Sequence, residues 1–540
     1  MWLEPMHRIP YKRIPNQPQI LLDALDSFAK VSGFFNGNFR DPDSYRNVWS
    51  DIQSFPFKRQ QVSDILVKEL DRLDAPAASL DNARLLADSK TAALLTGQQI
   101  GLLGGPIYTA VKAIAAIQWA ERLSKVLDTP VIPIFWMEGE DHDFEEIRHV
   151  NILDRDGNRL SVDLEDRHSN PHRVVGWRCP RKEMSAFLEH LDNVLPAGLH
   201  RDDVMDCVRA CYKPGMSLSD AFARWMLRWL GDRGLVVAES LNPDLKRLAS
   251  PYFQRAVTQA DHHGKIFKKR QEEIESSGYP CRLTPSTEFH LFYILENGVR
   301  KPVPRDASKD GMTKENLLKI AKDEPEHFSP KAVLRPIIQD VLFPTVAIVA
   351  GPGELCYFPQ VQSFYQDYKR AMPVVIPRPG VTMMEKSWSR NLKKLSLTVE
   401  DFFQSEAALN KKLAMEAHSD LLFGIETMTA NVSRILHDME SRVTSSLPGE
   451  SKHVEKLRLD VESRIQQFLN RIQNDLAAGD EITMRRVEEL RTAILPDGKL
   501  QERAYSPLIF LVRHGFQWIA DQLASVPIDE FEHVVLPLEE

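Results

Sequence analysis

The sequence predicts an α/β protein: a doubly wound, Rossmann-like parallel sheet with inserted connecting segments, followed by a C-terminal α-helical coiled coil. Two patterns of strand, glycine loop, helix and strand predict the sheet, at residues 92–136 and 346–376. Apolar residues at heptad spacing between positions 421 and 472 predict the coiled coil. A chain of 540 residues has room for roughly two to four domains.

The first of these patterns predicts where a ligand binds. Residues 92–95 are a short apolar run that stops at a turn signal, as a strand buried on both faces does. A glycine loop follows, and Pro106 suits the first turn of the next helix. Residues 131–136 are a second apolar run. Because the crossover between such strands is right-handed, both strands end on the same edge of the sheet, where open α/β sheets bind ligands.

The loop between the first strand and its helix carries glycines at positions 97, 101, 104 and 105. They match neither the dinucleotide pattern G-x-G-x-x-G nor the P-loop, which needs a following G-K-S/T. Glycines at such a turn let backbone N–H groups and the helix N-terminus approach a phosphate or a carboxylate. The alternative is close packing of the strand on the helix without a ligand.

The loop after the second strand carries the candidate catalytic residues, Glu140, Asp141, His142 and Asp143. Histidine can accept and release a proton near neutral pH, and neighbouring carboxylates can fix its tautomer. The alternative is a run of acids that only favours the N-terminus of the following helix. We interpret the cluster as functional because it lies on the same sheet edge as the glycine loop.

The second pattern repeats this design. Residues 346–350 form a buried strand that ends in Gly351-Pro352-Gly353-Glu354, and a helix leads to a strand at 374–376. This loop should face the same edge as the first, with Arg335 just upstream as a neighbour. The residues predicted to bind a nucleotide or substrate are Thr96, Gly97, Gln98, Gln99, Gly101, Gly104, Gly105, Tyr108, Lys112, Arg335, Gly351, Gly353, Glu354 and Arg378.

Composition and pattern divide the chain into parts. We expect a Rossmann-like core at 1–380 with insertions at roughly 151–215 and 240–330, a helical arm at 381–500, and a C-terminal segment at 501–540 that packs back on a globular surface. Shorter patterns predict helices at 20–35, 60–73, 217–230 and 482–495, a hairpin at 151–162, and strands at 235–238 and 289–295.

The arm is predicted to be an antiparallel helical hairpin. Alternating steps of three and four residues place Leu421, Met428 and Ile435 on one helical seam. A break at 445–449 separates this helix from a second one whose apolar seam runs from 457 to 472. Packing of the two seams within one chain is the simplest interpretation.

The overall composition excludes several classes of protein. Hydrophobic content of 43% and charged content of 27% are those of a globular protein, and a net charge of −8 disfavours nucleic acid or an anionic membrane as a partner. No apolar stretch is long enough to span a membrane, and the N-terminus has no signal-peptide core. Five scattered cysteines without a C-x-x-C pair suit reduced thiols, so we expect a cytoplasmic protein.

Three blocks of the sequence resemble the BshC family of bacillithiol biosynthesis. They are LLTGQQIGLLGGPIYTAVKA at 94–113, IPIFWMEGEDHDFEEI at 132–147 and VAIVAGPGELCYFPQ at 346–360. The order of elements that this family shows covers nearly the whole chain. The resemblance implies a cysteine ligase, which forms an amide between the carboxyl group of cysteine and the sugar amine of glucosaminyl-malate in the last step of the pathway. It also implies a homodimer formed through the coiled coil.

Amide formation of this kind needs an activated carboxyl group. By analogy with the cysteine ligase of mycothiol synthesis, the resemblance implies activation by ATP through an adenylate. The glycine loop would then bind phosphates, Lys112, Arg335 and Arg378 would bind the malyl carboxylates, and His142, oriented by Asp141 or Asp143, would take the proton of the amine.

The chain departs from adenylating synthetases in two ways. Those enzymes carry H-x-G-H after the first strand and a basic K-M-S-K-S loop later, whereas Thr96-Gly97-Gln98-Gln99 stands at the first position here. Their cysteine-activating relatives hold the thiolate with zinc, but the sequence shows no thiolate–histidine set, so we expect no metal.

Two other functions remain open from the sequence. A metal-dependent hydrolase or transferase could use the Glu140–Asp143 cluster to hold a hard divalent ion. A non-catalytic nucleotide-binding scaffold could use the coiled coil as its working part. Loss of activity on chelation would indicate the first, and nucleotide binding without turnover would indicate the second.

Overall fold

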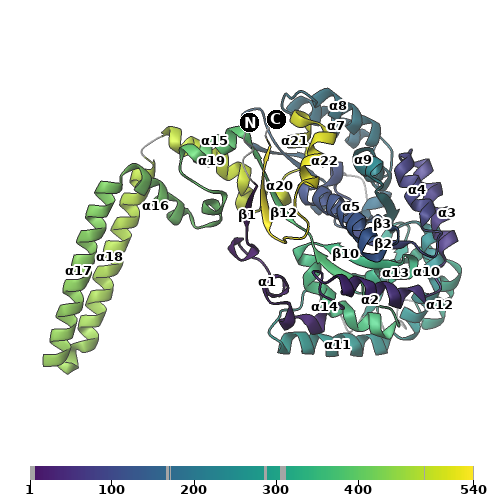
Figure 1. Cartoon of the computed structure of the whole chain (residues 1–540), viewed down its shortest axis with the longest axis horizontal. Coiled ribbons are helices and arrows are strands. Elements are labelled where there is room, and N and C mark those ends of the chain that lie inside the picture. The colour runs from purple at the N-terminus through teal and green to yellow at the C-terminus, as the bar shows by residue number, and fades with distance from the viewer. Residues whose placement is uncertain are drawn as a thin grey trace.

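The central sheet has five parallel strands in the order β11-β10-β2-β3-β6, of which Figure 1 labels β10, β2 and β3. The computed structural model describes residues 6–165, 170, 172–284, 289–304, 312–478 and 481–538. In chain order this is the arrangement 3-2-1-4-5 of a Rossmann sheet, and it confirms the predicted fold class. The strands are β2 (Ala92–Gln99), β3 (Val131–Glu138), β6 (Val236–Glu239), β10 (Thr345–Ala350) and β11 (Val374–Pro377).

The strand order changes direction between β2 and β10, and this point lies at the carboxyl edge of the sheet. Strands β2 and β3 pair in register from Ala92 opposite Val131 to Gln99 opposite Glu138. Beside them, the hydroxyl of Thr96 donates to the carbonyl of Val349 at 2.9 Å and ties β2 to β10. Because all five strands are parallel, the loops after β2, β3 and β10 meet at one edge, as the sequence predicts.

Two crossover helices connect these strands. Helix α5 (Ile107–Leu127) joins β2 to β3, and helix α14 (Pro352–Asp367) joins β10 to β11. Most residues of α5 are themselves buried, on all sides of the helix, and many of these are alanines. The helix therefore packs close to the sheet and is covered by other helices. It ends where Asp128 adopts a left-handed conformation just before Pro130.

Further helices surround the sheet, and the predicted helices at 60–73 and 217–230 are confirmed. The helix predicted at 20–35 ends at Asp26, and two short 3-10 turns follow it up to Phe34. The helices that surround the sheet are α1 (Gln19–Asp26), α2 (Pro42–Gln53), α3 (Arg59–Arg72), α4 (Ala77–Leu85), α7 (Lys182–Val194), α8 (Arg201–Cys211), α9 (Leu218–Leu230), α10 (Pro243–Thr258), α11 (Ala260–Ser276), α12 (Lys314–Asp323) and α13 (Arg335–Leu342). None of the helices in the described part of the chain is long and apolar enough to cross a membrane.

The inserted segments bring two small sheets to the carboxyl edge. The predicted hairpin consists of β4 (His149–Leu153) and β5 (Arg159–Asp163), preceded by the short helix α6 (Phe144–Ile147). The second sheet consists of β7 (Phe289–Glu296), β8 (Val299–Pro304) and β9 (Phe328–Pro330). Of the two expected insertions, residues 166–169, 171, 285–288 and 305–311 lie outside the described residues.

A separate sheet joins the two ends of the chain, and the sequence analysis did not predict it. Strand β13 (His533–Leu538) pairs antiparallel with β1 (His7–Ile9) and parallel with β12 (Gly380–Glu385). These strands are short, and their pairing joins residues more than 500 positions apart, such as His7 and Val535. Local pattern carries no information about pairing over that separation.

One buried ion pair connects the core to the segment after the arm. The guanidinium of Arg378 donates to both carboxylate oxygens of Glu502, at 2.8 and 2.6 Å, and the two side chains are only 2% and 3% exposed. Glu502 also accepts the backbone N–H of Val381 at 2.9 Å. Burial alone raises the pKa of Glu502, but the charge and hydrogen bonds of Arg378 hold that pKa below its ordinary value.

The predicted helical hairpin projects from the core as an arm (Figure 1). Its two helices are α17 (Ser419–Ser446) and α18 (Ser451–Ala478), and Arg458 of α18 reaches Glu440 of α17 at 2.6 Å. At the base of the arm lie α15 (Lys386–Lys394), α16 (Glu406–Ala417) and α19 (Glu481–Ile494). The chain then returns to the core through α20 (Gln501–Ala504), α21 (Leu508–His514) and α22 (Phe516–Ala524).

Replacing Glu502 by Gln should destabilise the core strongly. The change leaves the buried Arg378 without its carboxylate partner, and losing one member of such a pair costs about 3–5 kcal/mol. Calorimetry should show this as a lower Tm for the core. The control is Arg46→Gln, which removes the exposed pair between Arg46 and Asp43 and should change the unfolding free energy by no more than about 0.5 kcal/mol. Equal Tm values for the two variants would contradict the prediction.

Candidate functional site

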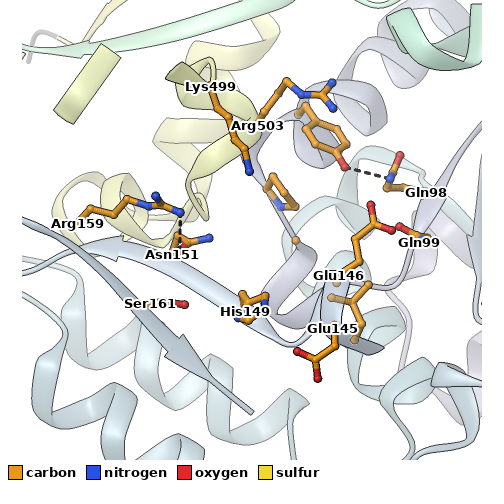
Figure 2. A pocket seen from close by; sticks show the side chains of 15 residues that line it. Gln98, Gln99, Glu145, Glu146, His149, Asn151, Arg159, Ser161, Lys499 and Arg503 are labelled. Carbon is orange, nitrogen blue, oxygen red and sulfur yellow. Dashed lines mark hydrogen bonds between the residues drawn. The ribbon is translucent and has the colours of Figure 1, made fainter. Parts of the chain in front are cut away.

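Two cavities lie at the carboxyl edge of the sheet. Cavity 1, of about 570 Å³, lies between the glycine loop after β2, the β4–β5 hairpin and the segment that follows α19. Figure 2 shows that Lys499 and Arg503 enter it from one side and Glu145 and Glu146 from another. Its lining residues are Gln98, Gln99, Gly101, Gly105, Pro106, Tyr108, Glu145, Glu146, Ile147, His149, Asn151, Arg159, Ser161, Lys499 and Arg503.

Lys499 and Arg503 give cavity 1 its positive side, and Arg159, which also lines the cavity, is paired with Asp497. Arg503 lies over the ring of Tyr108, with 5.7 Å between the guanidinium carbon and the ring centroid. Tyr108 in turn shares a hydrogen bond of 3.1 Å with the amide of Gln98. An anion can therefore bind at this side of the cavity, next to the predicted glycine loop.

The glycine loop serves packing and ligand access at different positions. Gly104 has a left-handed φ of +86°, and a Cβ placed on it would lie 2.7 Å from Nε1 of Trp225. Gly101 and Gly105 line cavity 1 instead. The first amide of α5, that of Ile107, already donates to the carbonyl of Tyr505 at 2.9 Å. Part of the helix N-terminus is thus satisfied by the C-terminal segment rather than left for a ligand.

Cavity 2, of about 690 Å³, lies on the other side of the loop after β3, against β7, β8 and α11. The basic side chains in its lining belong to Arg282, Arg300, Lys331 and Arg335, and His142 lines it as well. Arg300 and Lys331 both lie against the ring of Tyr293, at 4.4 and 4.8 Å from its centroid. The cavity is therefore strongly cationic around one aromatic ring.

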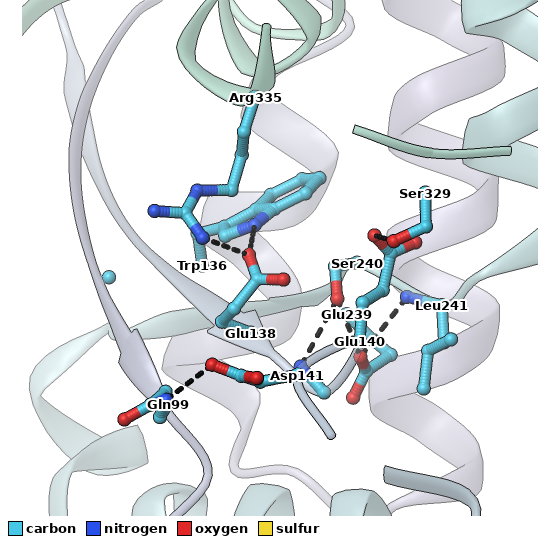
Figure 3. Close-up of polar contacts among 12 residues, drawn as sticks. Gln99, Trp136, Glu138, Glu140, Asp141, Glu239, Ser240, Leu241, Ser329 and Arg335 are labelled. Atoms are coloured by element: carbon cyan, nitrogen blue, oxygen red, sulfur yellow. Dashed lines mark hydrogen bonds and ion pairs between the residues drawn. The ribbon is translucent and has the colours of Figure 1, made fainter. Parts of the chain in front are cut away.

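A contact between Gln99 and Asp141 separates the two cavities (Figure 3). The amide of Gln99, which lines cavity 1, donates to the carboxylate of Asp141, which lines cavity 2. Burial raises the pKa of Asp141, but hydrogen bonds from Gln99 and from two backbone amides, together with the charge of Arg300, hold it below its ordinary value. Asp141 is thus kept as a carboxylate at the wall between the cavities.

His142 lies beside that carboxylate and opens to solvent. Its Nδ1 is 3.5 Å from Oδ1 of Asp141, and its side chain is 42% exposed. Its own backbone N–H donates to the same oxygen at 2.7 Å. His142 can therefore reach a ligand in cavity 2 while Asp141 stabilises a proton taken up on the ring.

The other acids of the predicted cluster are held in structural contacts. Glu140 is 1% exposed and is paired with Lys246, and the hydroxyl of Ser329 donates to it at 2.8 Å (Figure 3). Asp143 accepts the amide of Glu146 at 3.1 Å and caps α6, the helix-capping role that the sequence left open as the alternative. The histidine and the three acids of this cluster therefore do not converge on one point.

Most of the remaining predicted residues lie beneath the carboxyl edge of the sheet and hold its loops in place. Lys112 is 1% exposed, and its ammonium donates to Gly97 O, to Oε1 of Gln98 at 3.3 Å and to Oε2 of Glu354 at 2.6 Å. The same oxygen of Glu354 accepts the amide of Gly351 at 2.7 Å. Lys112 faces Glu354 and Arg378 faces Glu502, and neither of the two cations lines cavity 1 or cavity 2. Gly353 lies exposed in the first turn of α14.

Arg335 is the one predicted cation that lines a cavity. It lies at the N-terminus of α13 and pairs with Glu138, the last residue of β3, at 3.0 Å (Figure 3). Burial raises the pKa of Glu138, and Arg335 counteracts that rise. The pair fixes the base of cavity 2 next to Asp141.

Comparison with known proteins gives the family. The family model for the N-terminal Rossmann-like domain of bacillithiol biosynthesis BshC matches residues 5–379, and the model for the BshC C-terminal coiled-coil domain matches residues 381–538. The chain belongs to the BshC family. A relative from Salinibacter ruber, named "Putative cysteine ligase BshC", is 29% identical over 98% of both chains. One of the same name from Solibacter usitatus is 29% identical over 97% of this chain and 98% of its own.

A solved structure was also found, titled "putative arginyl t-RNA synthetase" from Campylobacter jejuni. It covers 86% of this chain and 98% of its own, with a TM-score of 0.24 and 10% sequence identity. A similarity this low carries no argument about fold or function.

In this BshC chain, most of the cations that line the cavities are not marked by any sequence pattern. Arg300 lies in the second insertion and Lys331 directly after it, Arg159 lies in the hairpin, and Lys499 and Arg503 lie in the returning segment. Each stands in an ordinary polar stretch, so no spacing marks it out. Only the folding of these segments over the sheet edge brings them to the cavities.

The metal-dependent alternative is not favoured in this BshC chain. Among the described residues, no group of three or more histidine, cysteine, aspartate or glutamate side chains could hold a metal ion. Glu140 and Asp143 are engaged as described above, which leaves Asp141 as the one acid of the predicted cluster that lines cavity 2.

We expect His142→Asn to lower turnover by roughly 100- to 10,000-fold, the usual size of a general acid–base effect. The side chain is exposed, so the Tm should stay that of the wild type. The control is His453→Asn on the arm, whose side chain is 82% exposed and which should keep full activity. The measurement is the rate of amide formation. A folded variant that works within about tenfold of the normal rate would exclude His142 as the base.

Proposed function

We propose that this BshC protein is a cysteine ligase of bacillithiol biosynthesis, which joins the carboxyl group of cysteine to the amine of glucosaminyl-malate. The family and its named relatives support the reaction class. We place the reaction in the cytoplasm, where the five free cysteines of the chain would stay reduced.

One observation carries the assignment of the site. Two cation-bearing cavities adjoin at the contact between Gln99 and Asp141, and His142 stands beside that contact. A ligase must hold an activated acyl group and an amine next to each other, with a base within reach of the amine. Adjoining cavities with a histidine at their boundary meet this need.

ATP is proposed as the second substrate, which would activate the cysteine carboxyl as an adenylate and release pyrophosphate. Cavity 1 suits its phosphates, because Lys499 and Arg503 supply positive charge and Gly101 and Gly105 permit close approach. Attack of the amine on the acyl carbon then forms the amide bond and displaces AMP. His142 would take the proton that the amine loses, with Asp141 stabilising the imidazolium.

Deleting the gene should abolish bacillithiol and cause glucosaminyl-malate to accumulate, because the last step is lost. Thiol labelling and mass spectrometry of cell extracts measure both compounds. The wild-type gene should restore bacillithiol, and a gene that carries His142→Asn should not. Normal bacillithiol in the deletion strain would contradict the proposed function, as would the absence of glucosaminyl-malate in both strains.

We also propose that the arm forms a homodimer with a second copy of the chain. Met428 and Ile435, on the predicted seam of α17, are 69% and 62% exposed, so packing within the hairpin leaves much of this seam uncovered. Exposed apolar residues repeated along a helix indicate a partner surface. The heptad spacing of these residues indicates that the partner is a helix, as a second arm would supply.

Replacing Met428 and Ile435 together by Asn should therefore convert a dimer into a monomer of 61.7 kDa, because the seam loses its apolar contacts. Light scattering measures the mass, and circular dichroism verifies that the helices persist. The control is Leu85→Asn, which changes an exposed leucine on α4 and should leave the dimer intact. A dimer that survives the double change with its helices folded must use another surface.

A further inference from the structure

Cavity 2 has an unusual balance of charge. Histidines aside, the charged residues in its described lining are Arg282, Arg300, Lys331 and Arg335 against the single acid Asp141. Within this lining, Arg335 pairs with Glu138 at 3.0 Å and Arg300 lies 3.7 Å from Asp141. A lining with more cations than acids favours an anionic ligand over a neutral or cationic one.

The cations are arranged around an aromatic platform. Arg300 is only 10% exposed, and its guanidinium lies 4.4 Å from the ring centroid of Tyr293. Lys331 approaches the same ring to 4.8 Å. Contact with one ring places both cationic groups next to Tyr293, which lines the cavity. Two carboxylates on neighbouring carbon atoms would fit such a pair, because each can meet its own cation.

The rest of the lining favours carboxylates over a nucleotide phosphate here. The glycine turn at the N-terminus of α5, which suits phosphates, lies in cavity 1. Cavity 2 offers guanidinium and ammonium groups together with apolar side chains such as Leu291, Pro302 and Val333. Guanidinium groups match carboxylates through two parallel hydrogen bonds, and apolar walls suit a short carbon chain between two carboxylates.

We propose that cavity 2 binds the malyl dicarboxylate of the amine substrate, with Arg300 and Lys331 as the residues that determine this specificity. The inference rests on the proposed function for the identity of the substrate. In glucosaminyl-malate the malyl group is attached to the anomeric carbon, and the amine is on the next carbon of the ring. A malyl group held at Tyr293 therefore keeps the amine in the cavity that His142 also lines.

The test compares Lys331→Gln and Arg300→Gln with Lys301→Gln. Lys301 neighbours Arg300 on β8, but its side chain is 58% exposed and pairs with Glu296, so its loss should change nothing. In the two cavity variants, KM for glucosaminyl-malate should rise about ten- to a hundredfold, the effect of losing one charge-assisted contact. KM for cysteine and for ATP should stay unchanged. Lys331→Arg, which keeps the charge, should restore most of the affinity.

Two further measurements test the malyl site without relying on turnover of glucosaminyl-malate: turnover of a substrate that lacks the malyl group, and direct titration with malate. Methyl glucosaminide, which lacks the malyl group, should be used equally poorly by the wild type and both variants. Calorimetric titration with L-malate should show binding to the wild type and to Lys301→Gln, and lost binding in the cavity variants. Arg300→Gln is judged only if its Tm is that of the wild type, and Lys331→Gln carries the test otherwise.

The possible outcomes separate the two proposals. If KM for ATP rises instead, cavity 2 is a phosphate site and the inference is overturned. It is also overturned if KM for glucosaminyl-malate does not change. If the wild-type protein makes no amide at all, the proposed function fails, and the L-malate titration alone decides: binding that depends on Lys331 supports a dicarboxylate site, and no binding overturns it.

Discussion

The buried ammonium of Lys112 is the interaction on which the sheet edge depends. It lies where the strand order changes direction, and it connects Gly97 on β2 to Glu354 at the start of α14. Burial lowers the pKa of Lys112, and the carboxylate of Glu354 opposes that shift. A buried charge is stable only when it is paired and hydrogen-bonded, so the two loops are held at a fixed separation. The positions of Gln98 and Gln99, and with them the wall between the cavities, follow from this contact.

The segment after the arm lines cavity 1 as well as contributing to the fold. It supplies Lys499 and Arg503 to cavity 1, and its Tyr505 carbonyl accepts the first amide of α5. The buried pair between Arg378 and Glu502 fixes this segment to the core. Because α19 at the base of the arm ends only a few residues before Lys499, a short segment of chain connects the arm directly to the cationic side of cavity 1.

The acidic residues in and next to the loop after β3 have different roles. Glu138 and Glu140 face Arg335 and Lys246 beneath the loop, and Asp143 caps α6. Asp141 and His142 are left facing cavity 2. Carboxylates this close together repel one another, and separate cationic or backbone partners are what allow them all to remain in one short loop.

The sequence by itself determined the Rossmann-like sheet, the helical hairpin and the sheet edge at which the two cavities lie, because these follow from local periodicity and the handedness of crossovers. It also singled out Asp141, His142 and Gln99, which stand in the loops at strand ends. Only the tertiary structure decided that Lys112 and Arg378 are buried in ion pairs, whereas Arg300, Lys331, Lys499 and Arg503 line cavities. The physical reason is that the partner of a charged side chain is chosen by contacts between distant segments, as in the sheet that joins β1 to β13, and local pattern does not encode those contacts.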